Sequence, residues 1–80
     1  MTDKKQTTLI QMESGQSGKV LQIEGGHGLT DRLSSMGVRP GQKLTKVSSM
    51  FMRGPVTVQL NGSRVAIGFG MAKKIMVELG

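Results

Sequence analysis

Strict alternation of apolar and polar residues toward the end of the chain predicts a β-hairpin. Val56–Leu60 alternates along its whole length, and the alternation resumes at Val65 and Ile67. Between the two segments stands Asn61-Gly62, a pair that readily adopts the positive φ angles of a two-residue turn. Each segment then has one apolar and one polar face, so we expect the hairpin to be half-buried.

Less regular patterns predict further strands. Leu9–Met12 is expected to be a short first strand, and Lys19–Glu24 alternates in the manner of a half-buried strand. Lys43–Ser49 has apolar residues three positions apart, so it is a strand only if a β-bulge resets its register. The last run, Ile75–Leu79, places its apolar residues on one side, and Met71–Lys74 before it is expected to form one helical turn.

One short amphipathic helix is expected in the middle of the chain, between two groups of glycines. Leu29, Leu33 and Met36 stand at i, i+4 and i+7, which gives the helix one apolar stripe. Gly37 follows where a helix takes a left-handed terminating residue, and Pro40 blocks continuation. A helix of about two turns is not stable alone in water, so we expect it to pack on the strands.

Short strands separated by turns, with one helix among them, predict a small antiparallel β-barrel. A chain of 80 residues has room for one domain with a thin core. We expect residues 1–8 to be a flexible polar tail and residues 9–80 to form that single domain. With no cysteine, the domain has to be held together by packing alone.

An ordered set of small and apolar residues runs through the whole chain. Its members are Gly15, Gly18 and Val20, then Gly25, Gly26, Leu29, Arg32, Leu33, Met36, Gly37, Pro40 and Gly41, and finally Gly54, Pro55, Val56, Val58, Gly62, Ala66, Ala72, Ile75 and Val77. In this order and spacing the set resembles the FeoA family, and the resemblance extends over residues 8–79. One departure is Gly68, where many members of the family have a basic residue.

The resemblance implies both a fold and a role. The fold would be a barrel of the Src-homology-3 type, with a short inserted α-helix and a short helical turn before the last strand. The role would be that of a small cytoplasmic accessory protein of ferrous iron uptake, which binds the cytoplasmic side of the transporter FeoB and modulates transport. It would reach the inner membrane face through this partner, and it would act as a non-enzymatic protein without a cofactor.

Residues that carry metal or catalytic chemistry are scarce. The resemblance links the chain to transition metal ions, but a site of its own would need His27, the single histidine, together with carboxylates such as Glu24 and Asp31. A histidine between glycines is more typical of a loop, so no metal ligands are assigned. No spacing favours a catalytic triad either. The first residues do not resemble a signal peptide, and no run of apolar residues is long enough for a membrane span, so we expect a cytoplasmic protein.

The excess of positive charge is compatible with a second function. The net charge is +6, from 11 Lys and Arg against 5 Asp and Glu, and Gly15–Val20 resembles the opening strand of small ribosomal barrels. The alternative is therefore a small basic barrel that binds RNA or nucleoprotein. Against it, the chain has no Trp or Tyr and only two Phe for stacking on bases, and its cations are scattered. Nucleic acid is thus not the expected partner.

Two features are candidates for the contact with a partner protein. Met50, Phe51 and Met52 are consecutive apolar residues, followed by Arg53, where a connecting loop is expected. Methionine and phenylalanine are frequent at adaptable binding surfaces. The alternative is that Phe51 closes the barrel end while the methionines fill gaps. Lys73 and Lys74 add an adjacent pair of charges, and we expect the isolated protein to be a monomer.

Overall fold

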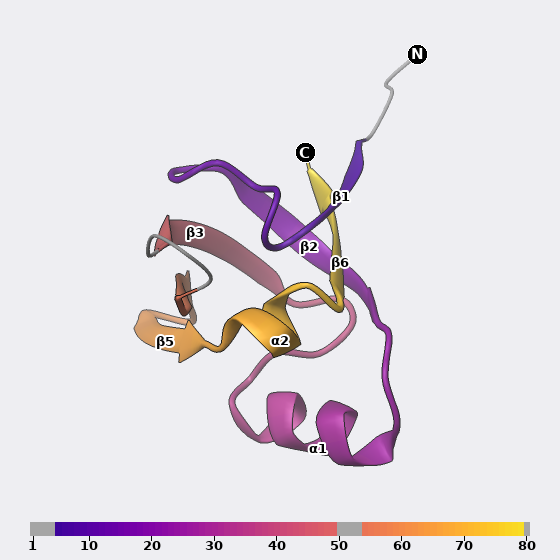
Figure 1. Ribbon diagram of the computed structural model, residues 1–80. Coiled ribbons are helices and arrows are strands. Elements are labelled where there is room, and N and C mark those ends of the chain that lie inside the picture. Colours follow the sequence, from indigo (N-terminus) through magenta and orange to yellow (C-terminus); the bar gives the residue numbers. More distant parts are fainter. Residues whose placement is uncertain (1–4, 50–53, 80) are drawn as a thin grey trace.

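A six-stranded antiparallel sheet organises residues 5–49 and 54–79, the part of the chain that the computed structural model describes. Two short helices interrupt the strands (Figure 1). In chain order the elements are β1 (Gln6–Thr8), β2 (Ser17–Ile23), α1 (His27–Ser35), β3 (Lys43–Ser49), β4 (Val56–Leu60), β5 (Ser63–Ile67), α2 (Phe69–Ala72) and β6 (Ile75–Leu79).

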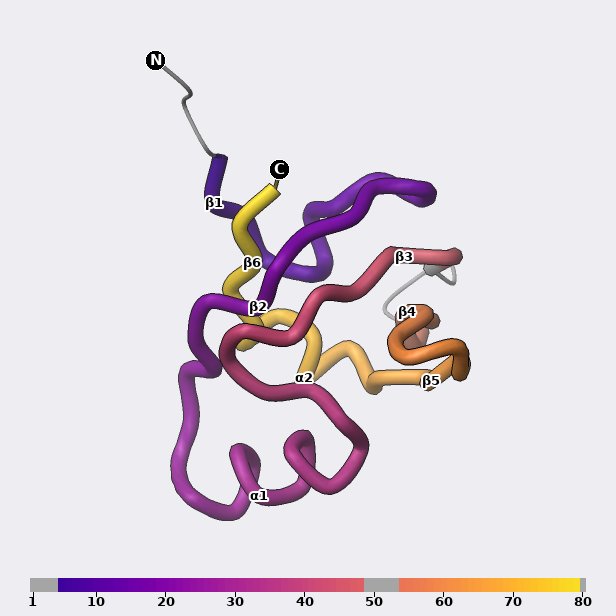
Figure 2. The backbone as a smooth tube through the Cα atoms, turned by 180° about the vertical axis from the view of Figure 1, so that it is seen from behind, coloured from indigo at the N-terminus to yellow at the C-terminus, as the bar shows by residue number. Residues whose placement is uncertain are grey.

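The strand order across the sheet is β1-β6-β2-β3-β4-β5, and every neighbouring pair is antiparallel. The last strand therefore lies between the first two, so both ends of the chain are tied into one part of the sheet. Figures 1 and 2 show the sheet curling so that β5 and β6 face each other across α2, while α1 lies beyond the strand ends at the opposite pole from β1. The predicted antiparallel architecture with an inserted helix is confirmed.

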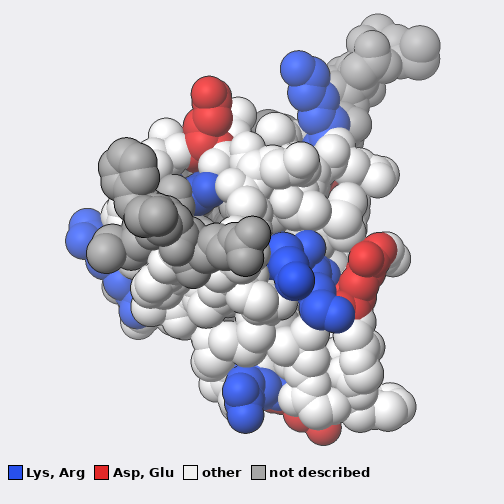
Figure 3. Space-filling view, in the orientation of Figure 1, with Lys and Arg blue, Asp and Glu red and all other residues white. Residues whose placement is uncertain are grey.

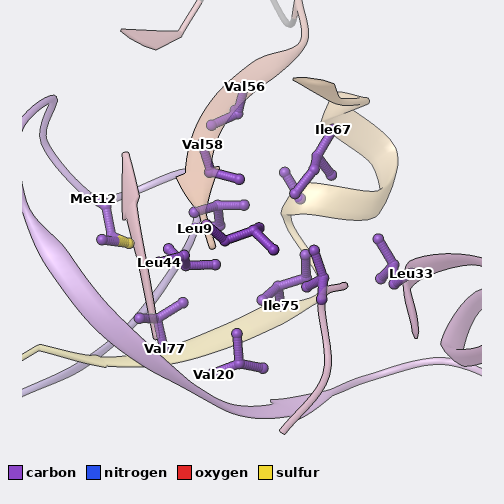
Figure 4. Packing of buried hydrophobic residues seen from close by; sticks show 13 residues of the cluster. Leu9, Met12, Val20, Leu33, Leu44, Val56, Val58, Ile67, Ile75 and Val77 are labelled. Atoms are coloured by element: carbon purple, nitrogen blue, oxygen red, sulfur yellow. The ribbon is translucent and has the colours of Figure 1, made fainter. Parts of the chain in front are cut away.

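A single apolar cluster fills the inside of the curled sheet, and every strand from β2 to β6 contributes to it (Figure 4). The helix α1 contributes Leu33, which is fully buried and which Figure 4 shows on the side of the helix that faces Ile75 and Ile67. Burying a leucine side chain stabilises a fold by about 2 kcal/mol. The cluster consists of Leu9, Met12, Val20, Leu33, Val38, Leu44, Val56, Val58, Leu60, Ile67, Ala72, Ile75 and Val77.

Several local predictions are confirmed. The hairpin forms between β4 and β5, and Asn61 and Gly62 have φ angles of 51° and 77°. The register of β3 against β4 shifts between Lys46 and Ser48, which is the expected bulge. The expected strand at 19–24 is β2, although it begins earlier, at Ser17, and has a register shift of its own against β6.

The helix α1 ends where the glycine pattern predicted. Gly37 has a φ of +92°, and the amides of Gly37 and Val38 donate to the carbonyls of Ser34 and Leu33 at 2.9 and 2.8 Å. These bonds satisfy carbonyl groups that would otherwise be left without partners at the helix end.

The prediction of a first strand at Leu9–Met12 is wrong. The strand is β1, three residues earlier, and Gln6–Thr8 pairs with Glu78, Val77 and Met76 of β6 although this segment was expected to be part of a tail. Residues 9–12 instead form a turn in which the amide of Met12 donates to the carbonyl of Thr8, and Leu9 and Met12 are buried. The apolar side chains of this segment thus belong to a turn that covers the core.

The helical turn before the last strand also begins earlier than predicted, at Phe69 instead of Met71. Gly68 is its N-cap, and the carbonyl of Gly68 accepts from the amides of Met71 and Ala72 at 3.0 and 2.8 Å. A glycine cap offers no side-chain acceptor, so the usual polar signal of a helix start is missing from the sequence.

Lys46 is the one charged side chain that is buried within the described ranges, with 2% of its surface exposed. Alternation from Leu44 turns it inward, beneath the turn at residues 9–12. Its Nζ donates to the carbonyl oxygens of Leu9 at 3.2 Å, Ile10 at 3.0 Å and Met12 at 2.5 Å. An ammonium group has three donors, so all of them are used. Burial lowers the pKa of Lys46 from its ordinary value of 10.5, because desolvation disfavours the charged form.

We expect Gly37→Val to destabilise the fold by more than about 1 kcal/mol, because a branched side chain is strained at a left-handed φ. A Cβ at this position would also lie 2.8 Å from Cδ1 of Leu60. Gly41→Val is the control for strain without the clash, since Gly41 has a φ of +91° but open space around it, and it should destabilise the fold less than Gly37→Val does. Thermal melting measures both variants, and a Gly37→Val midpoint equal to that of the parent protein contradicts the prediction.

Lys46→Met should lower the free energy of unfolding by about 2 to 4 kcal/mol, because two buried carbonyl groups and one part-buried carbonyl group lose their donor while the side-chain volume is nearly kept. Lys43→Met on the same strand is the control, since Lys43 is exposed and its replacement should stay within about 0.5 kcal/mol. Urea denaturation compares the two. Equal effects at both positions would show that the ammonium group does not hold the turn.

The lowered pKa of Lys46 predicts a pH dependence of stability. Between the folded pKa and 10.5, the unfolded chain binds more protons at this residue than the folded protein does. The free energy of unfolding of the parent protein should therefore rise with pH in this window, relative to Lys46→Met, and level off above it. Urea denaturation of both proteins at a series of alkaline pH values tests this, and a difference that is constant or falls with pH contradicts it.

Candidate partner-binding surface

The predicted contact loop connects β3 to β4. Its residues Met50, Phe51, Met52 and Arg53 lie outside the described residues, so their role stays a prediction. The chain on both sides of the loop is fixed, because Ser49 and Val56 are register partners at the end of the β3–β4 ladder.

Lys73 and Lys74 lie at the junction between α2 and β6, and both are exposed. Their backbone is fixed, since their amides donate to the carbonyls of Phe69 and Met71 at 3.1 and 3.0 Å, and the carbonyl of Lys74 accepts from Glu24 at 2.8 Å. Figure 3 shows blue side chains over this junction with red atoms beside them. Two accessible ammonium groups on a rigid backbone can attract an acidic surface, but neighbouring carboxylates weaken their field.

The three residues considered as metal ligands from the sequence do not form a cluster. His27 is the first residue of α1, and His27, Glu24 and Asp31 are all exposed. Across residues 5–49 and 54–79, no three His, Cys, Asp or Glu side chains lie together as a set of metal ligands. In the same part of the chain, neither helix has the length and apolar character that a membrane span requires.

The outer face of β2, β3, β4 and β5 is a second polar surface, and the sequence pattern did not predict it. One row of register partners crosses it from Ser17 through Thr45 and Gln59 to Arg64, and the neighbouring row joins Lys19 to Lys43. We call these six residues the outer polar face. The alternation of each strand places these residues on the side opposite the buried residues, so their exposure could be predicted from the sequence. The strand pairing that brings them together could not be predicted from it.

An open hollow of about 310 Å³ lies where β3 begins and β4 ends, and Lys43, Thr45 and Gln59 of the outer polar face are among the residues that line it. It is of the size at which small-ligand clefts begin. Its lining combines one ammonium group, three amides and one hydroxyl with two leucines and a glycine. The residues are Gln42, Lys43, Leu44, Thr45, Gln59, Leu60, Asn61 and Gly62.

The family comparison and the curated relative point to the same family. The FeoA domain family matches residues 7–79. A protein of Methanocaldococcus jannaschii named as an Fe(2+) transport protein A is 42% identical over 66 residues, which cover 82% of this chain and 78% of that protein. The family match includes every element from β2 to β6.

Solved structures share the fold. The crystal structure of an iron uptake regulatory protein, FeoA, is 37% identical and superimposes with a TM-score of 0.89 over 95% of this chain and all of that one. FeoA of Stenotrophomonas maltophilia, solved in complex with zinc and described as a prokaryotic SH3 domain protein, is 24% identical with a TM-score of 0.74 over 89% of this chain and 88% of that one. The prediction of a Src-homology-3-like fold is thereby confirmed. With a family match that covers nearly the whole chain and a relative above 40% identity, the chain belongs to the FeoA family of ferrous iron transport proteins.

Proposed function

We propose that this protein is a non-enzymatic accessory factor of ferrous iron uptake, which binds the cytoplasmic side of a FeoB-type transporter through protein–protein contacts and modulates iron transport. The observation that carries the proposal is the family match over residues 7–79. The name of the Methanocaldococcus jannaschii relative, an Fe(2+) transport protein A, supports the link to ferrous iron.

Physical features of the chain suit a docking protein. The net charge of +6 favours approach to acidic protein surfaces and to the anionic inner leaflet. Anionic lipid attracts a nearby Lys or Arg by about 1 kcal/mol, and this attraction is screened over a Debye length of about 8 Å at physiological salt. Charge therefore helps only close to the membrane, and the affinity has to come from contacts such as those proposed for Met50–Arg53.

RNA binding is the weaker candidate. A stacking platform needs aromatic side chains, and the chain has two Phe and neither Trp nor Tyr. Of the two, Phe69 is half-buried in α2. Of the cations, Lys19 lies on β2, whereas Arg39 and Lys73 lie in connecting segments outside the helices and strands.

The docking proposal predicts separate effects for the apolar loop and for the charges. Phe51→Ala should weaken capture of detergent-solubilised FeoB by about tenfold, because an aromatic anchor commonly contributes more than about 1 kcal/mol to binding. Its amide NMR spectrum should stay close to that of the parent protein. Joint replacement of Lys73 and Lys74 by Gln should mainly reduce the dependence of capture on salt.

The control for the lysine pair is the joint replacement of Arg32 and Arg39 by Gln, which removes the same charge at other exposed positions. If Phe51→Ala unfolds the protein without a specific loss of capture, Phe51 is a core residue and docking occurs elsewhere. If the control pair changes the salt dependence as much as the lysine pair does, only net charge matters.

A further inference from the structure

The hollow in the outer polar face exists because two paired strands part. The β3–β4 ladder runs from Ser49 opposite Val56 to Thr45 opposite Gln59, where the pairing stops. Beyond this point β3 continues along β2 only, while β4 turns away into β5 through Asn61 and Gly62. The strands thus leave an open space at one end of the ladder, and the side chains of both strand ends line it.

The lining of the hollow is rich in hydrogen-bond donors. The Gln42 side-chain nitrogen donates to the Lys43 carbonyl at 2.9 Å and to Oδ1 of Asn61 at 3.5 Å. Because Oδ1 of Asn61 is the acceptor, the amide nitrogen of Asn61 keeps its donors for a ligand. The Lys43 ammonium and the Gln59 amide are exposed beside it, and Leu44 and Leu60 are buried beneath them.

The charges around the hollow have one sign. Lys43 lines it, Lys19 is the register partner of Lys43, and Arg64 is the register partner of Gln59. None of the eight lining residues is acidic.

The nearest carboxylate in the same row is on the far side of Lys19. Glu78 of β6 is the other register partner of Lys19, so it offsets the charge of Lys19 and leaves that of Lys43 and Arg64. These two cations are on β3 and β5, the strands on either side of β4. An anionic ligand is therefore drawn toward β4, over the hollow.

We infer that the outer polar face binds an acidic peptide segment of a partner protein, with one carboxylate in the hollow beside Lys43 and a second carboxylate at Arg64. Lysine, arginine and side-chain amides are all donors suited to carboxylate oxygens. An RNA strand is disfavoured, since no aromatic residue lines the hollow for stacking. The inference rests on the proposed function in taking the segment to belong to the transporter.

The hollow and the candidate loop share one ladder. Residues 50–53 follow the end of the ladder at Ser49, and the hollow lies at its other end, at Thr45. Thr45 and Ser49 are four positions apart along the strand, which corresponds to about 14 Å. A partner segment that lies over the hollow can therefore also reach the end of the ladder at Ser49.

NMR titration of the labelled protein with a blocked peptide of alternating Glu and Ala tests the inference. Backbone amides of residues 42–45 and 59–62 should shift, the shifts should weaken with salt, and the matching Gln and Ala peptide should cause none. Lys43→Gln and Arg64→Gln should each weaken binding by about threefold to fivefold, which is the effect of an exposed charge pair. Gln59→Glu should weaken it as well, and Arg32→Gln, which removes the same charge at an exposed position of α1, should not.

Three outcomes overturn the inference: equal binding by the neutral peptide, peptide shifts confined to other residues, and shifts of the same size with inorganic phosphate or an RNA oligonucleotide. Capture of solubilised FeoB separates this inference from the proposed function. If the peptide binds at the hollow but the parent protein captures no FeoB, the site stands and the proposed function fails. If FeoB is captured equally by the parent protein and by the double variant of Lys43 and Arg64, the function stands and the assignment of this face fails.

Discussion

The ammonium group of Lys46 is the interaction on which the N-terminal part of the fold depends. It takes the carbonyls of Leu9, Ile10 and Met12 as its three acceptors, inside the core. The backbone of the same residue joins the next part of the chain, since its amide donates to Gln16 at 2.9 Å and its carbonyl accepts from Gly15 at 2.7 Å. One residue of β3 thus holds the chain on both sides of the turn that leads from β1 into β2.

The contacts of Lys46 compensate for the small core of this domain. A domain of 80 residues has little apolar surface to bury and no cysteine with which to close loops. The buried lysine joins segments 34 to 37 residues apart in the sequence and lets Leu9 and Met12 add to the core without a strand. The cost is the desolvation of a charge, and the lowered pKa of Lys46 is its signature.

The sequence predicted those parts of the fold that depend on neighbouring residues. Alternation was sufficient for the β4–β5 hairpin and for β6, and Gly37 was sufficient for the end of α1. The prediction of a strand failed at Leu9–Met12, because a short apolar run does not distinguish a strand from a turn whose conformation is set by a distant lysine. At the candidate surface, the exposure of Lys73 and Lys74 followed from their charge. The hollow did not, because it arises where β3 and β4 cease to pair, which no local pattern encodes.

The pairing of β1 with β6 also determines how this domain can be joined to other proteins. The amide of Leu79 donates to the carbonyl of Lys5 at 2.8 Å, so the two ends of the folded unit are neighbours, at the pole opposite α1 (Figure 1). Domains whose ends meet tolerate insertion into a host loop and circular permutation. A short linker between the ends would close the chain into a ring, and new ends could then be opened at the β4–β5 turn without breaking a strand.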